Sequence, residues 1–346
     1  SVAYRAASLP DRQEAHRALA DSIDAELDPD RRAWHRAQAA TGPDEDVAVE
    51  LERSAGRAQA RGGIAAAAAF LERAATLTQD PARRADRALD AAQAKIQAGA
   101  FEPAAGLLAM AEAGPGDELR LARIDLLHAQ IAFARSRGNE ATPLMLAAAR
   151  RFEQLDIPLA RETYLGAIAA AIFAGRLARG PGLREVGEAA RGAPSLELPR
   201  LLNSLLDALA LRLTDGYSAS ARMMQRVLAA LCAEEIPVQE ALRWLWLGTI
   251  IAADLWDDER WHLLATRHLK ITREAGALSE LPAALDTLAA IHIIYGELQA
   301  ATSLVEEARI VWEGTGTDQA RYAPLTLAAM RGHEREARAL IDAMMS

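Results

Sequence analysis

The sequence predicts an all-α fold, a right-handed superhelix of antiparallel helix pairs with about 18 helices. Hydrophobic residues make up 51% of the chain and aromatic residues only 5%, so small and aliphatic side chains that favour helices dominate. Turns recur at nearly constant intervals. No stretch alternates apolar and polar residues over the length of a strand.

The repeating turns are the strongest of these observations. Seven glycines mark them, and Trp256 in the segment Leu255–Asp258 fills the one gap: Gly62, Gly99, Gly138, Gly175, Gly216, Gly296 and Gly332. Successive turns are 36 to 41 residues apart. Glycine ends a helix by adopting a left-handed conformation that other residues reach only at a cost. A general helical bundle has no reason to repeat its turn at this spacing, so we favour a solenoid.

The residues around each turn predict a helical hairpin. Alanine stands five residues after five of the eight turns, at Ala67, Ala104, Ala221, Ala301 and Ala337. From Ala67 the same helix face continues through Leu71 and Ala74. Prolines mark the starts of partner helices, at Asp80-Pro81, Ile157-Pro158, Leu198-Pro199, Ile236-Pro237 and Leu281-Pro282. We therefore expect residues 1–346 to form a single helical-repeat domain.

The segment Gly99-Ala100-Phe101-Glu102-Pro103-Ala104 resembles the tetratricopeptide repeat, with a turn glycine, an aromatic residue and an alanine at the fifth position. The period exceeds that family's roughly 34 residues, and the tryptophan and tyrosine of its first helix are mostly absent. The resemblance therefore implies degenerate repeats with lengthened helices, a tetratricopeptide-like α-solenoid.

A second resemblance concerns the N-terminal half. Three stretches carry it: Asp28–His35 through Gly62-Gly63, Leu71–Ala75, and Asp80–Ala85 with the turn Gly99–Phe101. They resemble the middle region of large actinobacterial LuxR-type transcriptional regulators, strongly over about residues 1–175 and weakly beyond. In that family an ATPase precedes the helical repeats and a helix-turn-helix follows them. In the related maltose-responsive regulators the middle region holds an inducer.

The sequence lacks the motifs of the two flanking domains. Neither Lys95 nor Lys270 lies in the Gly-Lys-Ser/Thr context of a phosphate-binding loop. The C-terminal residues Glu334–Ser346 read as an ordinary repeat helix. We therefore expect this chain to be the regulatory middle of a longer protein, with the ATPase and helix-turn-helix domains elsewhere in the full-length chain.

Charge and composition exclude several classes. The net charge is −9 and the pI about 5.4, so direct nucleic-acid binding by this segment is not expected. The single Cys232 permits no intramolecular disulfide and no cysteine-based zinc site, and its apolar surroundings favour a buried core residue. The longest apolar run, Ala241–Trp256, is shorter than the roughly 20 residues of a membrane span. We expect a cytoplasmic protein.

No pattern predicts catalysis. His333-Glu334 begins like a zinc-protease helix, but Ala337 stands where the second histidine would be. The acidic trio Asp257-Asp258-Glu259 has only Glu306-Glu307 as a downstream acidic pair, so a helix N-terminus explains it better than magnesium. We expect no catalytic residue, no cofactor and no metal, and hence no enzyme.

Aromatic residues give the candidate binding site. Trp244, Trp246, Trp256 and Trp261 fall within eighteen residues of an otherwise aromatic-poor chain. Tryptophan offers a large apolar face and one N–H donor, which suits it to stacking on a ligand or peptide. The groove we predict is lined by Tyr164, Trp244, Trp246, His292 and Tyr295. The alternative is that these residues are large core fillers.

Three functions follow as hypotheses. The first is a non-catalytic sensor or interaction module of a transcriptional regulator, which receives a small-molecule inducer or a protein partner in a concave groove. The second is a scaffold that binds a peptide without any small-molecule role. The third is an all-α enzyme with a central cavity.

Overall fold

The computed structural model describes residues 7–136, 140–175, 180–195, 200–315 and 322–345. Over these residues it contains 18 helices and no strand, which confirms the predicted all-α class. The described structure divides into two compact units, Ser1–Ile124 (unit 1) and Asp125–Ser346 (unit 2), and the single repeat domain stays a prediction. Each is described by itself. The boundary falls within helix α8, Glu118–Ser136.

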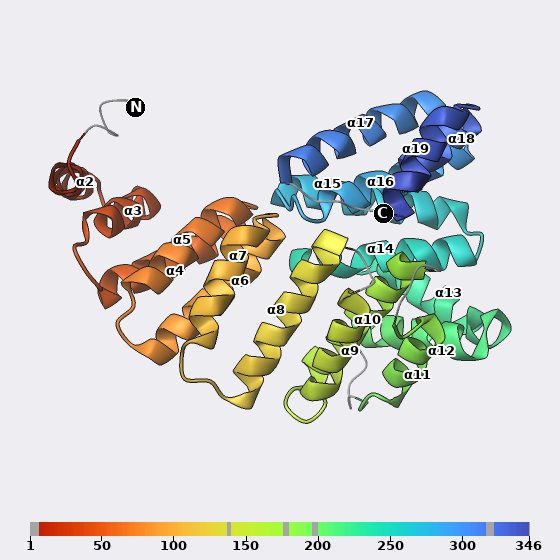
Figure 1. Ribbon diagram of the computed structural model, residues 1–346, viewed down its shortest axis with the longest axis horizontal. Helices are drawn as coiled ribbons and strands as arrows, with labels where there is room; N and C mark the ends of the chain where they lie inside the picture. Colours follow the sequence, from red (N-terminus) through yellow and green to blue (C-terminus); the bar gives the residue numbers. More distant parts are fainter. Residues whose placement is uncertain (1–6, 137–139, 176–179, 196–199, 316–321, 346) are drawn as a thin grey trace. The chain divides into compact units, whose positions relative to one another are not determined.

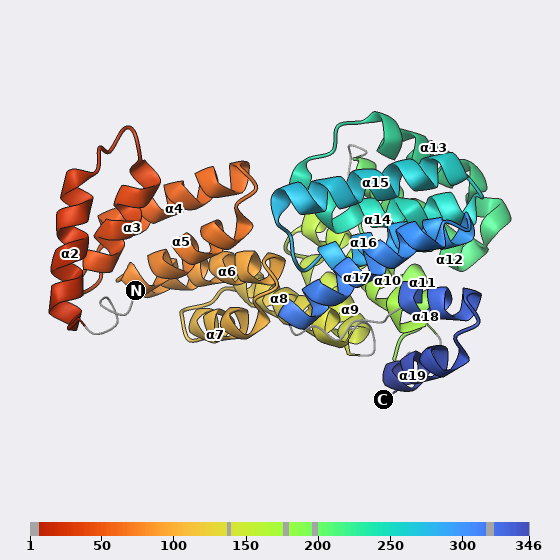
Figure 2. The same ribbon diagram turned by 90° about the horizontal axis from the view of Figure 1, so that it is seen from above.

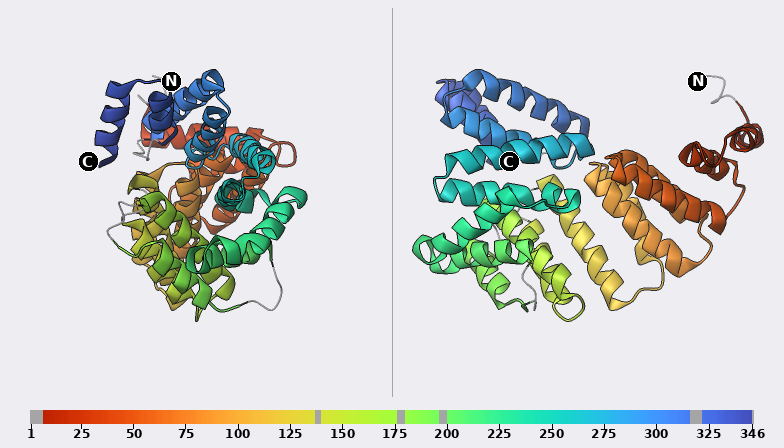
Figure 3. Two further views of the ribbon diagram at one scale, coloured as in Figure 1. Left: turned by 90° about the vertical axis from the view of Figure 1, so that its right-hand side faces the viewer. Right: turned by 180° about the vertical axis from the view of Figure 1, so that it is seen from behind.

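Unit 1 is a series of antiparallel helices in which each packs on the next. They are α2 (Leu9–Ser22), α3 (Pro29–Ala39), α4 (Glu45–Ala60), α5 (Ile64–Leu77), α6 (Pro81–Gln97) and α7 (Phe101–Glu112), followed by the start of α8. Figure 1 shows α4 to α7 side by side, and the rear view in Figure 3 shows the same order. The contacts are therefore those of consecutive helix pairs.

Unit 2 continues the same pattern after the rest of α8. Its helices are α9 (Ala141–Phe152), α10 (Ile157–Ala174), α11 (Leu183–Gly192), α12 (Leu201–Asp215), α13 (Tyr217–Ala233), α14 (Val238–Asp254), α15 (Asp258–Ala275), α16 (Leu281–Ile294), α17 (Leu298–Thr315), α18 (Tyr322–Met330) and α19 (Glu334–Met345). Each helix from α14 to α17 contacts the next along the chain, and Figure 2 shows the four as close neighbours. Paired helices that pack in chain order are consistent with a solenoid.

The predicted turns are present. Gly138 lies outside the described residues, and the other six turn glycines all have a positive φ, between 50° and 87°. Trp256, which fills the gap in the series, also has a positive φ of 56°. Gly276 also ends a helix, α15, in the left-handed region, with a φ of 63°. It lies midway between two of the repeating turns, so their spacing did not predict it.

The hairpin details are also largely confirmed. Ala67, Ala104 and Ala301 are fully buried, whereas Ala221 and Ala337 are only partly so. Prolines occupy the first turns of α6, α10 and α16, and Pro237 caps the N-terminus of α14. The pair Leu198-Pro199 lies outside the described residues.

Arginine side chains tie each repeat to its neighbour in addition to apolar packing. Arg87 of α6 reaches Glu45 and Glu52 of α4, and Arg161 of α10 reaches Asn203 and Asp207 of α12. Further links are Arg73 to the Ala37 carbonyl, Arg120 to Asp86, Arg123 to Asp90, Arg212 to Asp254, and Arg273 to Glu307. The residues so joined are 33 to 46 positions apart, which is about one repeat.

One contact in unit 2 spans much more of the chain. The Tyr322 hydroxyl at the start of α18 donates a hydrogen bond of 3.1 Å to the Phe173 carbonyl near the end of α10, 149 residues earlier. The C-terminal helices of this unit therefore return to the beginning of its helix series.

Helix α10 is long and apolar enough to cross a membrane by length and composition, and no other described helix meets that test. Its most apolar stretch is 67% buried within the unit, and the helix carries the charged Arg161 and Glu162. These are also the properties of a core helix.

Candidate binding surfaces

Two of the five predicted groove residues, Tyr164 and Trp244, lie in the core of unit 2. The Tyr164 side chain on α10 is 1% exposed, and its hydroxyl donates a 2.6 Å hydrogen bond to Glu153 Oε1. Burial and this bond raise the pKa of Tyr164. Trp244 on α14 is 5% exposed, and its Nε1 donates to Glu162 Oε1 at 3.1 Å. Both polar groups are thus satisfied inside the protein.

Trp246 is buried as well, at 8% exposure. Its ring packs at 5.2 Å from that of Phe173, which in turn lies 5.6 Å from the ring of Phe133. Its Nε1 donates to the Arg243 carbonyl within α14. Trp244 and Trp246 therefore fill space between helices, and neither indole presents a face to solvent.

The other two predicted residues lie around the end of α16. Tyr295 is 44% exposed, its ring stacks with His262 of α15 at 6.3 Å, and its hydroxyl donates to the Asp258 carbonyl at 3.4 Å. His292 makes an edge contact with the same His262 ring and a 2.5 Å hydrogen bond with Glu297. The structure thus sorts the five residues into a buried group and a surface group. Their joint role in one ligand groove stays a prediction.

A different surface, which the sequence analysis did not identify, surrounds helix α13. Two cavities open on it, of about 740 Å³ and 340 Å³, and Arg226 lines both. The larger one is also lined by Arg222 and Arg260, and the smaller one by Arg200. We name the four guanidinium-bearing residues Arg200, Arg222, Arg226 and Arg260 the α13 arginine surface.

Three of the four arginines of the α13 arginine surface form no ion pair with the described residues, although Glu234 also lines the smaller cavity. Only Arg260 forms an ion pair, with Asp257 at 2.8 Å, and the Asp257 carboxylate is also the N-cap of α15. Over the described residues, Arg200, Arg222 and Arg226 have no acidic side chain within ion-pair distance. This sets them apart from the many arginines that link repeats.

The sequence did contain a signal for this surface. Helix α13, Tyr217–Ala233, has no aspartate or glutamate in 17 residues, although the chain as a whole carries a net charge of −9. Its two arginines, Arg222 and Arg226, are four residues apart and so lie on one face. The local charge of this helix is thus positive although the chain as a whole is acidic, and the net charge of the chain does not reveal this difference.

Apolar side chains lie beside these charges. Leu255 lines the larger cavity, and Leu201, Met223 and Val227 line the smaller one. Cys232, near the end of α13, is half-buried, and burial raises the pKa of its thiol, which disfavours the nucleophilic thiolate. The surface therefore offers positive charge with apolar patches and fits binding better than cysteine chemistry.

Among the described residues, no group of three or more histidine, cysteine, aspartate or glutamate side chains is placed to hold a metal ion. The sequence matches no known protein-family model, and a search of curated proteins found no relative.

Proposed function

We propose that this chain is a non-catalytic interaction module of a transcriptional regulator, and that it receives its signal by binding an acidic segment of a partner protein along α13. The observation that carries the proposal is the α13 arginine surface, in which Arg200, Arg222 and Arg226 are exposed and have no ion-pair partner among the residues that the structure describes. Guanidinium groups recognise carboxylates with paired hydrogen bonds, and arginine is enriched at protein interfaces.

The arrangement supports an extended or helical segment as the bound partner. Arg226 lines both cavities, so the two are adjacent. A peptide that occupies one cavity can therefore continue into the other. Met223 and Val227 provide apolar contact for non-acidic side chains of the same segment. Peptides that bind helical surfaces commonly combine such apolar anchors with complementary charge.

The regulatory context rests on the resemblance of the N-terminal half to the middle region of LuxR-type regulators. It predicts that the full-length reading frame encodes an ATPase before this segment and a helix-turn-helix after it. Sequencing the gene in both directions tests this. If the reading frame encodes neither domain, the regulatory role is contradicted, and the protein would be a peptide-binding scaffold that uses the same α13 arginine surface.

The binding proposal is tested by fluorescence anisotropy with a labelled peptide of glutamate, leucine and alanine. We expect saturable binding that weakens with added salt, and a loss of about tenfold or more in affinity in the double variant Arg222→Glu, Arg226→Glu. The matched control is the double variant Arg53→Glu, Arg335→Glu, which reverses two exposed arginines without an ion-pair partner in the described chain and should change affinity little.

Two results would contradict the proposal. One is an equal loss of affinity in the double variant Arg53→Glu, Arg335→Glu, which would show that only net charge matters. The other is binding of a DNA duplex as tight as that of the acidic peptide and equally sensitive to the double substitution, which would assign the surface to nucleic acid.

A further inference from the structure

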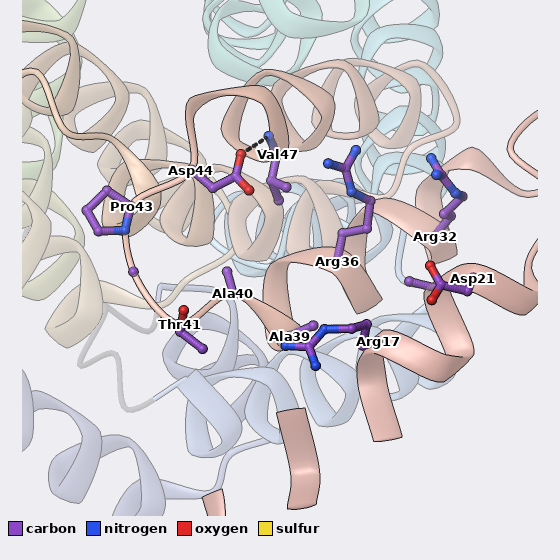
Figure 4. A pocket seen from close by; sticks show the side chains of 12 residues that line it. Arg17, Asp21, Arg32, Arg36, Ala39, Ala40, Thr41, Pro43, Asp44 and Val47 are labelled. Atoms are coloured by element: carbon purple, nitrogen blue, oxygen red, sulfur yellow. Dashed lines mark hydrogen bonds between the residues drawn. The ribbon is translucent and has the colours of Figure 1, made fainter. Parts of the chain in front are cut away.

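A second charged cavity lies in unit 1, between α2, α3 and the segment that leads into α4. Its volume is about 320 Å³. Figure 4 shows Arg17 and Asp21 on one wall, Arg32 and Arg36 on the adjacent wall, and Thr41 to Asp44 closing a third side. None of these residues belongs to the α13 arginine surface, so this site is independent of the function proposed above.

The sequence places these side chains by simple helical spacing. Arg17 and Asp21 are four residues apart on α2, and Arg32 and Arg36 are four apart on α3. The two helices run antiparallel. A hydrogen bond of 3.3 Å from Gln13 Nε2 to the Ala40 carbonyl fixes their register, which sets Arg17 opposite Arg36 and Asp21 opposite Arg32.

Small residues keep the cavity open. Ala20, Ala39 and Ala40 line it where larger side chains would fill it, and Ala20 and Ala39 are buried against neighbouring helices. The other apolar lining residues are only Pro43 and Val47. A cavity with so little apolar surface and several charged groups favours a small polar ligand over a lipid or an aromatic compound.

Three arginines and two aspartates line the cavity, so the lining side chains carry a net charge of +1. Arg36 forms an ion pair with Glu50 of α4, and Asp44 is engaged as the N-cap of α4, where it accepts from the Val47 N–H at 3.1 Å. Neither Arg17 nor Arg32 has an acidic side chain within ion-pair distance in the part of the chain that the structure describes. Two guanidinium groups thus face one free carboxylate, that of Asp21.

We propose that this cavity binds a small metabolite through a carboxylate or phosphate group held by Arg17 and Arg32. The guanidinium plane offers two parallel N–H donors that match the oxygen spacing of both groups. The volume lies at the lower end of the range for small-molecule sites. The Asp21 carboxylate repels a second negative charge on the ligand. It attracts an ammonium group, so a ligand that carries an amine beside its acidic group is favoured.

Isothermal titration calorimetry of the full chain tests the site with three probes: inorganic phosphate, succinate and glutamate. We expect saturable binding of at least one of them, and a loss of about tenfold or more in affinity in Arg17→Gln and in Arg32→Gln. Asp21→Asn should tighten phosphate binding, because it removes the repelling carboxylate.

The matched control is Arg53→Gln, since Arg53 is an exposed arginine of α4 that lies outside the cavity and has no ion-pair partner in the described residues. It removes the same charge from the same unit and should leave the affinity unchanged. No saturable heat with any of the three probes would overturn the proposal, as would equal weakening by Arg53→Gln and Arg17→Gln. The α13 variants do not alter this cavity, so either proposal can fail alone.

Discussion

At the scale of single residues, Trp256 combines a backbone cost with an exposed side chain. It is the one non-glycine residue with a positive φ in the described chain. Its indole is 91% exposed, so packing of the side chain offsets little of the backbone strain. A left-handed conformation costs an L-residue about 1–2 kcal/mol. Glycine occupies the equivalent turn positions elsewhere in the series.

We therefore expect Trp256→Gly to raise the free energy of unfolding by about 1 kcal/mol. This is the gain that remains after the higher conformational entropy of glycine in the unfolded chain offsets part of the relieved strain. Urea denaturation measures this. Trp256→Ala keeps the backbone cost and serves as the control. An equal gain in the alanine variant would show that the exposed indole, and not the φ angle, is unfavourable.

His268 on α15 predicts a dependence of stability on pH. Its side chain is 1% exposed, and desolvation lowers its pKa to about 4, although its Nε2 contacts the Leu242 carbonyl at 3.1 Å. The unfolded chain binds this proton at about pH 6.5. The unfolded chain therefore takes up the proton before the folded protein does. The free energy of unfolding is unaffected by His268 above about pH 6.5 and decreases as the pH falls toward 4, by about 3 kcal/mol at most.

Unfolding measured between pH 7 and 4.5 tests this, with His268→Gln as the comparison. Glutamine retains an N–H donor for the Leu242 carbonyl but does not titrate, so the variant should lose less stability than the parent as the pH falls. Identical pH profiles for the two proteins would show that His268 does not carry the effect.

Residue environments were the least predictable part of the candidate site. Burial of the Trp244 indole depends on Glu162, which lies 82 residues earlier in the chain and accepts its N–H. Periodicity places a residue on a helix face but does not say which distant helix covers that face. The open or buried state of each aromatic residue was therefore beyond the sequence pattern.

At the scale of the helices, arginines that cross one repeat provide a second source of cohesion. Arg87 on α6 is 6% exposed and donates to Glu45, to Glu52 and to the Thr78 hydroxyl at the end of α5. It thus joins three consecutive helices. Arg83 on the same helix also reaches Glu45, at 3.2 Å, but remains largely exposed.

We expect Arg87→Met to lower the free energy of unfolding by about 2 kcal/mol, because three acceptors lose a buried donor group. Arg83→Met should cost about 0.5 kcal/mol or less, since exposed ion pairs contribute little. Chemical denaturation of both variants makes the comparison. Equal losses would mean that burial does not distinguish the two arginines.

Helix limits were more accessible from the sequence than these links. Glycine at positive φ and proline in a first turn act through local backbone geometry, so Gly99 and Pro81 could be placed correctly without tertiary information. The chain holds only two lysines, so arginine supplies nearly all of its positive charge. Which arginines pair and which stay free depends on the register between repeats, which spacing alone does not fix.

At the scale of the whole molecule, contacts run mainly between neighbours in chain order. That order follows from regular turns, and the sequence predicted it. The division into two compact units within α8 and the return contact from Tyr322 to Phe173 were not predictable. Both involve residues far apart in the chain, and local residue patterns do not record such relations.

The reach of the arginine links has a consequence for how such a chain changes length during evolution. The links from Arg87 to Glu52, from Arg161 to Asp207 and from Arg273 to Glu307 each join a helix to its counterpart in the adjacent repeat. An in-frame duplication of one repeat, roughly 40 residues, would copy both the donor and the acceptor, so that the inserted copy finds a partner on each side. A gene segment that encodes one repeat can therefore be duplicated without leaving the charged groups of these links unpaired.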